Sequence, residues 1–239
     1  MKKPSLKFLR SKKFLISAGL VVVLCVGVII GLMTVKNQNL YKTVLSHVSE
    51  ARYYMKSASS DNLNVQFYSG MREEPYAQDG VTGTMTPFAI INVDPKDASL
   101  KNFSQISGTV QIGDEQIPIT LDKNPYDVNF ATDISRLVDS AYDVTVTLNL
   151  SETDNPTFTL VNAMDAAAFT WQQALQIATD TLTNEIKNYG NYEVYVKIIN
   201  NPADGTGAFW YVQFITAEGN THFCVIAADG SVVGSCIDE

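Results

Sequence analysis

The sequence predicts a single N-terminal transmembrane helix, then an antiparallel β-sandwich, then a small α+β domain with one helix on an antiparallel sheet. Twenty uncharged residues stand near the N-terminus, short alternating segments follow them, and the hydrophobic period becomes helical near residue 166. We expect five parts. They are a basic tail at 1–13, a membrane span at 14–33, an amphipathic helix at 36–58, a sandwich at 61–163 and the α+β domain at 165–239.

The charge of the chain is unevenly distributed. Six of the 17 Lys and Arg residues precede residue 36, where no acidic residue occurs; the other 11 accompany all 25 acidic residues, a net charge of −14. This acidic part is poorly suited to bind the phosphates of nucleic acid, so we expect no nucleic-acid partner. A hydrophobic content of 46% excludes a disordered chain, and three cysteines are too few for a disulfide-built miniprotein.

The predicted span runs from Phe14 to Met33. A helix of that length is about 30 Å long, the thickness of the hydrocarbon core of a bilayer. The cations on its N-terminal side predict a cytoplasmic tail and an extracellular segment at 36–239, hence a single-pass cell-membrane protein. A cleaved signal peptide is disfavoured because the apolar core is long and no convincing cleavage site follows it. Cys25 follows a leucine, so it does not indicate a lipoprotein signal.

The segment after the span has apolar residues at a spacing of three to four, which predicts one face of an amphipathic helix. These residues are Leu40, Val44, Val48, Ala51 and Met55. The helix is compatible with a stalk, with a coil that forms a homodimer through 36–58, or with a strut packed on the next domain. His47 is interpreted as a polar residue beside the apolar face.

The middle segment has the alternation of β-strands. In Tyr142–Leu150 every second residue is apolar, and Gly113-Asp114 stands between two such runs, as a hairpin requires. The stretch LVDSAYDVTVTL resembles the tyrosine corner of immunoglobulin-like and fibronectin-type domains, with Tyr142 at the corner and Leu137 beneath it. The resemblance implies an Ig-like sandwich and no particular function.

The C-terminal segment starts with a helical pattern for which Thr170 is the predicted N-cap. Strand-like runs follow, and Asp229-Gly230 predicts the last hairpin turn. The TWQQALQIA, YEVYV, FWYVQF and FCVIAADGSVVGS stretches resemble a PepSY domain over about residues 169–237. The resemblance implies a bacterial envelope protein that inhibits or chaperones a peptidase, without catalytic residues.

Cys224 and Cys236 flank this last hairpin and form a candidate disulfide. A strict two-residue turn would place Cys224 opposite Ser235, with Cys236 diagonal to it, so the register decides whether a bridge can form. The alternatives are two buried thiols and a reactive or metal-binding pair. His222 lies two residues from Cys224 and is interpreted as an edge or surface histidine.

Four aromatic residues form a candidate binding surface, although a role in the core is favoured for them: Trp171, Phe209, Trp210 and Tyr211. The Asp-Pro and Asn-Pro turns lack the ligand spacing of a calcium loop. No catalytic, metal or cofactor site is predicted, because none of the familiar hydrolase, phosphate-loop or dinucleotide motifs occurs.

We therefore expect a non-enzymatic, membrane-anchored extracellular protein that binds another envelope protein or a peptidase, or takes part in envelope assembly. Two alternatives remain open. The first is a wall-modifying hydrolase with a site between the two domains, which would need converging carboxylates or a nucleophile and base. The second is a purely structural module on a stalk.

Overall fold

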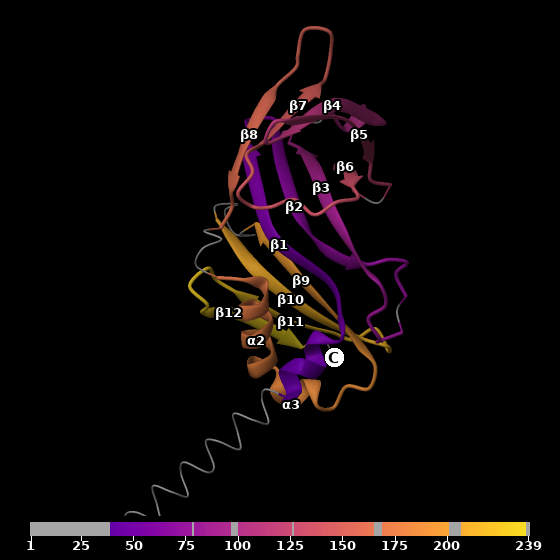
Figure 1. Ribbon diagram of the computed structural model, residues 1–239, viewed down its shortest axis with the longest axis vertical. Helices are drawn as coiled ribbons and strands as arrows, with labels where there is room; N and C mark the ends of the chain where they lie inside the picture. Colours follow the sequence, from indigo (N-terminus) through magenta and orange to yellow (C-terminus); the bar gives the residue numbers. More distant parts are fainter. Residues whose placement is uncertain are drawn as a thin grey trace, which may run out of the picture. The chain divides into compact units, whose positions relative to one another are not determined.

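The computed structural model describes residues 39–77, 79–96, 100–125, 127–164, 169–200 and 207–237. Contacts divide the chain into a unit at 1–43, of which residues 39–43 are described and helical, and a compact unit at 44–239. The second unit holds a 12-stranded sheet and the helices α2 and α3 (Figure 1).

Eight strands of this sheet close into an antiparallel barrel. Their order is β1-β2-β3-β6-β5-β4-β7-β8, and β8 pairs with β1 to complete the ring. Their bounds are β1 Val48–Ser59, β2 Leu63–Glu73, β3 Met85–Pro95, β4 Gln105–Ile112, β5 Glu115–Lys123, β6 Phe130–Ile134, β7 Val144–Asn149 and β8 Thr157–Asn162. A short 3-10 helix, η2, spans Leu100–Asn102 between β3 and β4.

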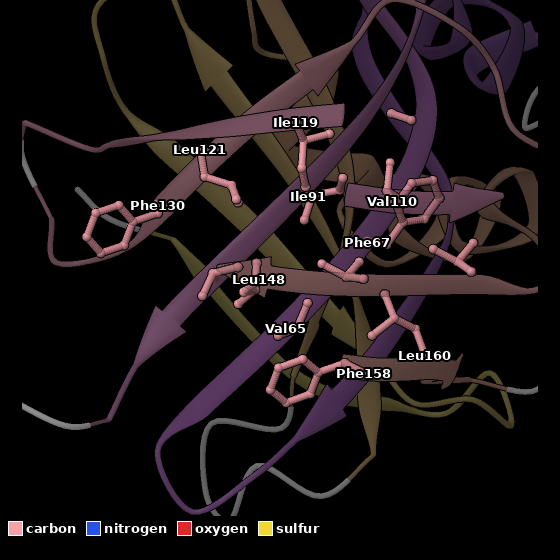
Figure 2. Packing of buried hydrophobic residues seen from close by; sticks show 14 of the residues in the cluster. Val65, Phe67, Ile91, Val110, Ile119, Leu121, Phe130, Leu148, Phe158 and Leu160 are labelled. Carbon is pink, nitrogen blue, oxygen red and sulfur yellow. The ribbon is translucent and has the colours of Figure 1, made fainter. Parts of the chain in front are cut away.

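The inside of the barrel is a hydrophobic core to which the strands contribute alternate residues. In β7, for example, Val144, Val146 and Leu148 are fully buried, while the threonines between them are half-buried. Figure 2 shows the aromatic and aliphatic side chains that fill this core, among them Phe67, Phe130 and Phe158.

The remaining strands extend the sheet beyond β1. They are β9 Tyr192–Asn200, β10 Ala208–Thr216, β11 Thr221–Ile226 and β12 Val232–Ile237, and β9 pairs with β1 in parallel. Helix α2, Trp171–Thr181, packs on β9, β10 and β11, and α3, Thr183–Ile186, follows it. The predicted N-cap is confirmed: Thr170 and Gln173 form a capping box at the start of α2.

The predicted Ig-like sandwich with a separate PepSY-like domain is wrong. The strands at 61–163 close into a barrel with β1, and β9 to β12 continue the same sheet through β1. The tyrosine corner is also absent: Tyr142 is 53% exposed and Leu137 is 47% exposed, so neither side chain anchors a core. Strand alternation is the same in a sandwich and in a barrel, and therefore could not separate the two.

The helix predicted at 36–58 is replaced by a helix at 39–45 and strand β1. Because β1 lies between β2 and β9 and its pairing shifts at Val48/Glu50 and at Arg52/Tyr54, its buried residues do not alternate strictly. Ala51 and Met55 are buried four residues apart in a strand, which imitates helical spacing.

The predicted single-pass membrane topology is likewise not supported. Across the part of the chain that the structure describes, no helix is long and apolar enough to cross a membrane. The predicted span at 14–33 and tail at 1–13 lie outside the described residues.

Candidate functional site

The loop between β2 and β3 builds one wall of the candidate site, and its far end is fixed to the start of β1. The Thr82 hydroxyl donates to the backbone carbonyl of Ser46 at 2.8 Å and lies 3.1 Å from that of Val48. At the near end, the Glu74 backbone N–H donates to the carbonyl of Thr84 at 3.0 Å. These bonds hold the loop against the start of β1.

His47 ties the same loop to β9. Its Nδ1 lies 2.6 Å from the carbonyl oxygen of Gly80 and 3.1 Å from that of Tyr192. Two carbonyl oxygens can only accept, so Nδ1 carries the proton and donates. Gly80 has a φ of 74°, and a Cβ there would lie 2.6 Å from the Cβ of Asn191, so this close approach requires glycine.

Glu73, the last residue of β2, is the central side chain of the site. It is 5% exposed, and its Oε1 accepts the backbone N–H of Gly83 at 2.7 Å. A Cβ at Gly83 would lie 2.6 Å from this oxygen, so glycine allows the loop to approach the carboxylate. The other oxygen, Oε2, has no hydrogen-bond partner among the described residues. A buried carboxylate oxygen without a donor is costly and marks a place where a ligand can supply one.

Ser49 supplies a second unsatisfied oxygen next to Glu73. It is 2% exposed, and its Oγ also lacks a partner in the described part of the chain. Its backbone lies where the pairing between β1 and β9 shifts. Both residues line one pocket of about 610 Å³, together with Glu50, Arg72, Glu74, Pro75, Tyr76 and Tyr195.

Glu193 on β9 is a second buried carboxylate beside this pocket. It is 2% exposed, and its Oε2 accepts the hydroxyls of Tyr76 and Tyr195, each at 2.8 Å. Its Oε1 has no partner among the residues that the structure describes. Burial, followed by the hydrogen bonds to Tyr76 and Glu193, raises the pKa of Tyr195. The Tyr195 phenol therefore stays protonated at neutral pH and remains a donor to Glu193.

The other charged groups that line the pocket have ionic partners. Glu50 accepts from Arg52 Nε at 2.8 Å. The Arg72 guanidinium is shared between Asp133 and Glu74, and the Glu74 carboxylate lies 3.5 Å away. The positive charge of Arg72 is thus already compensated by two carboxylates.

Glu73 and Glu193, by contrast, have no ion pair with a described Lys or Arg. The pocket therefore has an uncompensated negative charge and oxygen acceptors. A ligand that fits must bring positive charge and N–H donors, as an ammonium or guanidinium group does. No cluster of three or more His, Cys, Asp or Glu side chains that could hold a metal ion occurs in the described residues.

The structure holds Cys224 and Cys236 as thiols on opposite faces of the sheet. Cys224 is opposite Ser235, as the predicted register required, and Cys236 is opposite Phe223. Because neighbouring residues of a strand point to opposite faces, Cys224 points to α2 and Cys236 points away from it. Burial raises the pKa of the Cys224 thiol.

The predicted hairpin turn is one residue longer than expected. The Gly230 backbone N–H donates to the carbonyl of Ala227 at 2.9 Å, and Gly230 adopts a φ of 85°. Asp229 Oδ1 accepts the backbone N–H and the hydroxyl of Ser231. A shift in the pairing of β11 and β12 at Val225/Ile226 accommodates the extra residue.

The structure separates the four aromatic residues of the candidate binding surface. Trp210 is 2% exposed and lies on the buried face of β10. Phe209 and Tyr211 are half-buried on the opposite face of the same strand. Trp171 stacks on Tyr53 of β1, with ring centroids 5.9 Å apart and planes 2° apart.

The interpretation of His222 as an edge or surface histidine is wrong. Its strand β11 lies between β10 and β12, and His222 is 8% exposed beside Tyr189, with ring centroids 4.8 Å apart. Three residues of the candidate site were not predicted from the sequence: Ser49, Glu73 and Glu193. Glu73 precedes an ordinary Glu-Pro turn, and Glu193 alternates with valines in a strand whose two faces cannot be ranked from sequence. No local signal distinguishes a buried carboxylate from an exposed one when both stand at strand ends.

No protein-family model matches this chain, and it has no match among curated proteins or solved structures. The PepSY and Ig-like resemblances therefore receive no support from relatives.

Proposed function

We propose that this protein is a binding protein without catalytic chemistry of its own, and that its Glu73 pocket takes a positively charged nitrogen group of its ligand. The observation that carries the proposal is the pair of buried, unsatisfied oxygens, Glu73 Oε2 and Ser49 Oγ, on two residues that line one pocket. An ammonium or guanidinium group would satisfy both oxygens and the buried charge at once.

The predicted partner, an envelope protein or a peptidase, rested on the predicted anchor, the acidic segment, the lack of catalytic motifs and the PepSY resemblance. The binding role proposed for the Glu73 pocket does not depend on that partner. A ligand is recognised here by its charge and its hydrogen-bond donors.

Calorimetric titration of the full-length protein with butylammonium and butylguanidinium tests the proposal, with 1-pentanol as a neutral probe of similar size. We expect saturable binding of the two cations and none of the alcohol. Glu73→Gln should weaken binding at least tenfold. Glu74→Gln, which makes the same charge change at the same pocket, should alter affinity less than threefold because Glu74 already pairs with Arg72. Equal binding of cation and alcohol, or equal effects of the two variants, would contradict the proposal.

A hydrolase is the second candidate, and the observation that favours it is the presence of two buried carboxylates, Glu73 and Glu193, near one pocket. It is the weaker candidate because Glu193 does not line the pocket and is committed to two tyrosine hydroxyls. Turnover of chromogenic glycosides or esters that disappears in Glu73→Gln would favour it over the binding role.

A further inference from the structure

The sheet formed by β9 to β12 has two different faces. On one face, Val196, Val212 and Cys224 lie side by side across the strands and are fully buried, and α2 packs on this side. On the other face, from Tyr195 onward in β9, the side chains are half-buried, as the alternating burial of β9, β10 and β11 shows. That second face, which we call the open face, carries Tyr195, Lys197, Phe209, Tyr211, Phe223 and Val225.

The register places the side chains of the open face in rows. Tyr195 lies opposite Gln213, which lies opposite Phe223. Tyr211 lies between Lys197 and Val225 in the next row, and the Tyr211 and Phe223 rings have centroids 5.2 Å apart. Apart from Gln213 and Lys197, the rows are apolar or aromatic, and we call them the strip across these three strands.

This strip begins at the Glu73 pocket. Tyr195 belongs to the open face and also lines the pocket, where its ring lies 6.4 Å from that of Tyr76. When the charged group of a ligand is in the pocket, the part of the ligand that extends out of the pocket therefore contacts aromatic rings. A small free amine would fill the pocket without contacting these rings.

We infer that the ligand is a polypeptide segment whose lysine or arginine side chain enters the Glu73 pocket, while apolar residues on either side of it lie along the open face. This inference rests on the proposed function. The negative pocket selects the basic residue, and the aromatic strip selects its apolar neighbours.

Lys197 further limits which polypeptide segments can bind. Its Nζ lies 4.9 Å from the centroid of the Tyr195 ring, within the strip. A second basic residue next to the first would be brought close to this cation and repelled. The fitting segment thus has one basic residue among apolar ones, and is not polybasic.

Calorimetry with the full-length protein and three probes tests the inference: acetyl-Phe-Val-Lys-Val-Phe-amide, the same peptide with norleucine for lysine, and acetyl-lysine-amide. We expect the lysine peptide to bind at least tenfold more tightly than either other probe. Phe223→Ala should remove most of the advantage of the peptide over acetyl-lysine-amide and leave the latter's Kd within twofold. Phe223→Leu should retain the advantage, and Leu137→Ala on the barrel should change nothing.

The outcomes distinguish a failure of this inference from a failure of the proposed function. If acetyl-lysine-amide binds in a Glu73-dependent way but the peptide gains nothing, or Phe223→Ala has no effect, the inference is wrong and the proposed function stands. If the norleucine peptide binds as tightly as the lysine peptide, the inference is also wrong. If neither lysine probe binds, the proposed function itself is wrong.

Discussion

Glu73 is a charged side chain that the fold buries against the backbone of Gly83 without satisfying its second oxygen. Residues placed for binding are commonly not those that best stabilise the fold. We expect Glu73→Gln to raise the free energy of unfolding by about 1 kcal/mol, because an uncompensated buried charge is removed while Oε1 still accepts from Gly83. Urea unfolding of both proteins measures this. A loss of 1 kcal/mol or more would show instead that the carboxylate holds the loop in place.

Tyr192, whose backbone carbonyl accepts from His47 in the candidate site, makes the free energy of unfolding depend on pH in the alkaline range. Burial raises the pKa of Tyr192 to about 12, above its usual value of 10. The stability that this difference contributes is fully present below pH 10 and is lost as the pH rises towards 12, since only the unfolded chain ionises readily in that window. Unfolding free energies measured at pH 9, 10.5 and 11.5 should therefore fall. The fall should be smaller in Tyr192→Phe and unchanged in Tyr142→Phe, whose hydroxyl belongs to an exposed residue.

Substitutions in the hairpin between β11 and β12 test where its turn lies. Gly230 has a φ of 85°, and a Cβ there would lie 3.2 Å from the Phe169 ring. Gly230→Val should cost about 1–2 kcal/mol of unfolding free energy, because a β-branched residue resists this conformation. Gly234→Val is the matched control: it lies in β12 with no atom within 4 Å of the new Cβ, so it should cost much less. Equal melting temperatures for the two variants would mean that the turn lies elsewhere.

The two faces of the same hairpin predict different thiol reactivity. Cys224 is fully buried beneath α2 and Cys236 is half-buried on the open face. In a Cys25→Ser background, a thiol reagent should label Cys236 in the native protein and Cys224 only after unfolding, two thiols in all. A count of zero in the unfolded, unreduced protein would establish the predicted disulfide. Faster labelling of Cys224 would contradict the placement of its side chain.

The elements that the sequence predicted correctly are local ones. The N-cap at Thr170 and the hairpin at Gly113-Asp114 depend on neighbouring residues alone. The closure of the barrel depends on the pairing of Lys56 with Asn162, residues more than a hundred positions apart, and alternation gives no information about such partners. The candidate site was missed for the same reason, because Glu73 and Glu193 come together only when β2 and β9 flank β1.

For the whole unit at 44–239, β1 is the shared element. It pairs with β2 and β8 in the barrel and with β9 in the extension. We expect the barrel and the extension to unfold in one transition, because without β1 the barrel is open between β2 and β8 and β9 loses its partner on that side. Thermal unfolding followed by the fluorescence of Trp171 and Trp210 in the extension, and by circular dichroism of the backbone, should give one midpoint. Two midpoints would indicate independent domains, as the boundary predicted at residue 165 implies.

The Glu73 pocket is proposed to bind a positively charged nitrogen group. The most direct measurement is an experimental structure of the full chain with acetyl-lysine-amide bound. We predict the lysine nitrogen within hydrogen-bond distance of Glu73 Oε2, about 2.7–2.9 Å, with Ser49 Oγ as a second partner. A bound ligand whose nitrogen lies outside this pocket, or an empty pocket at saturating ligand, would contradict the account.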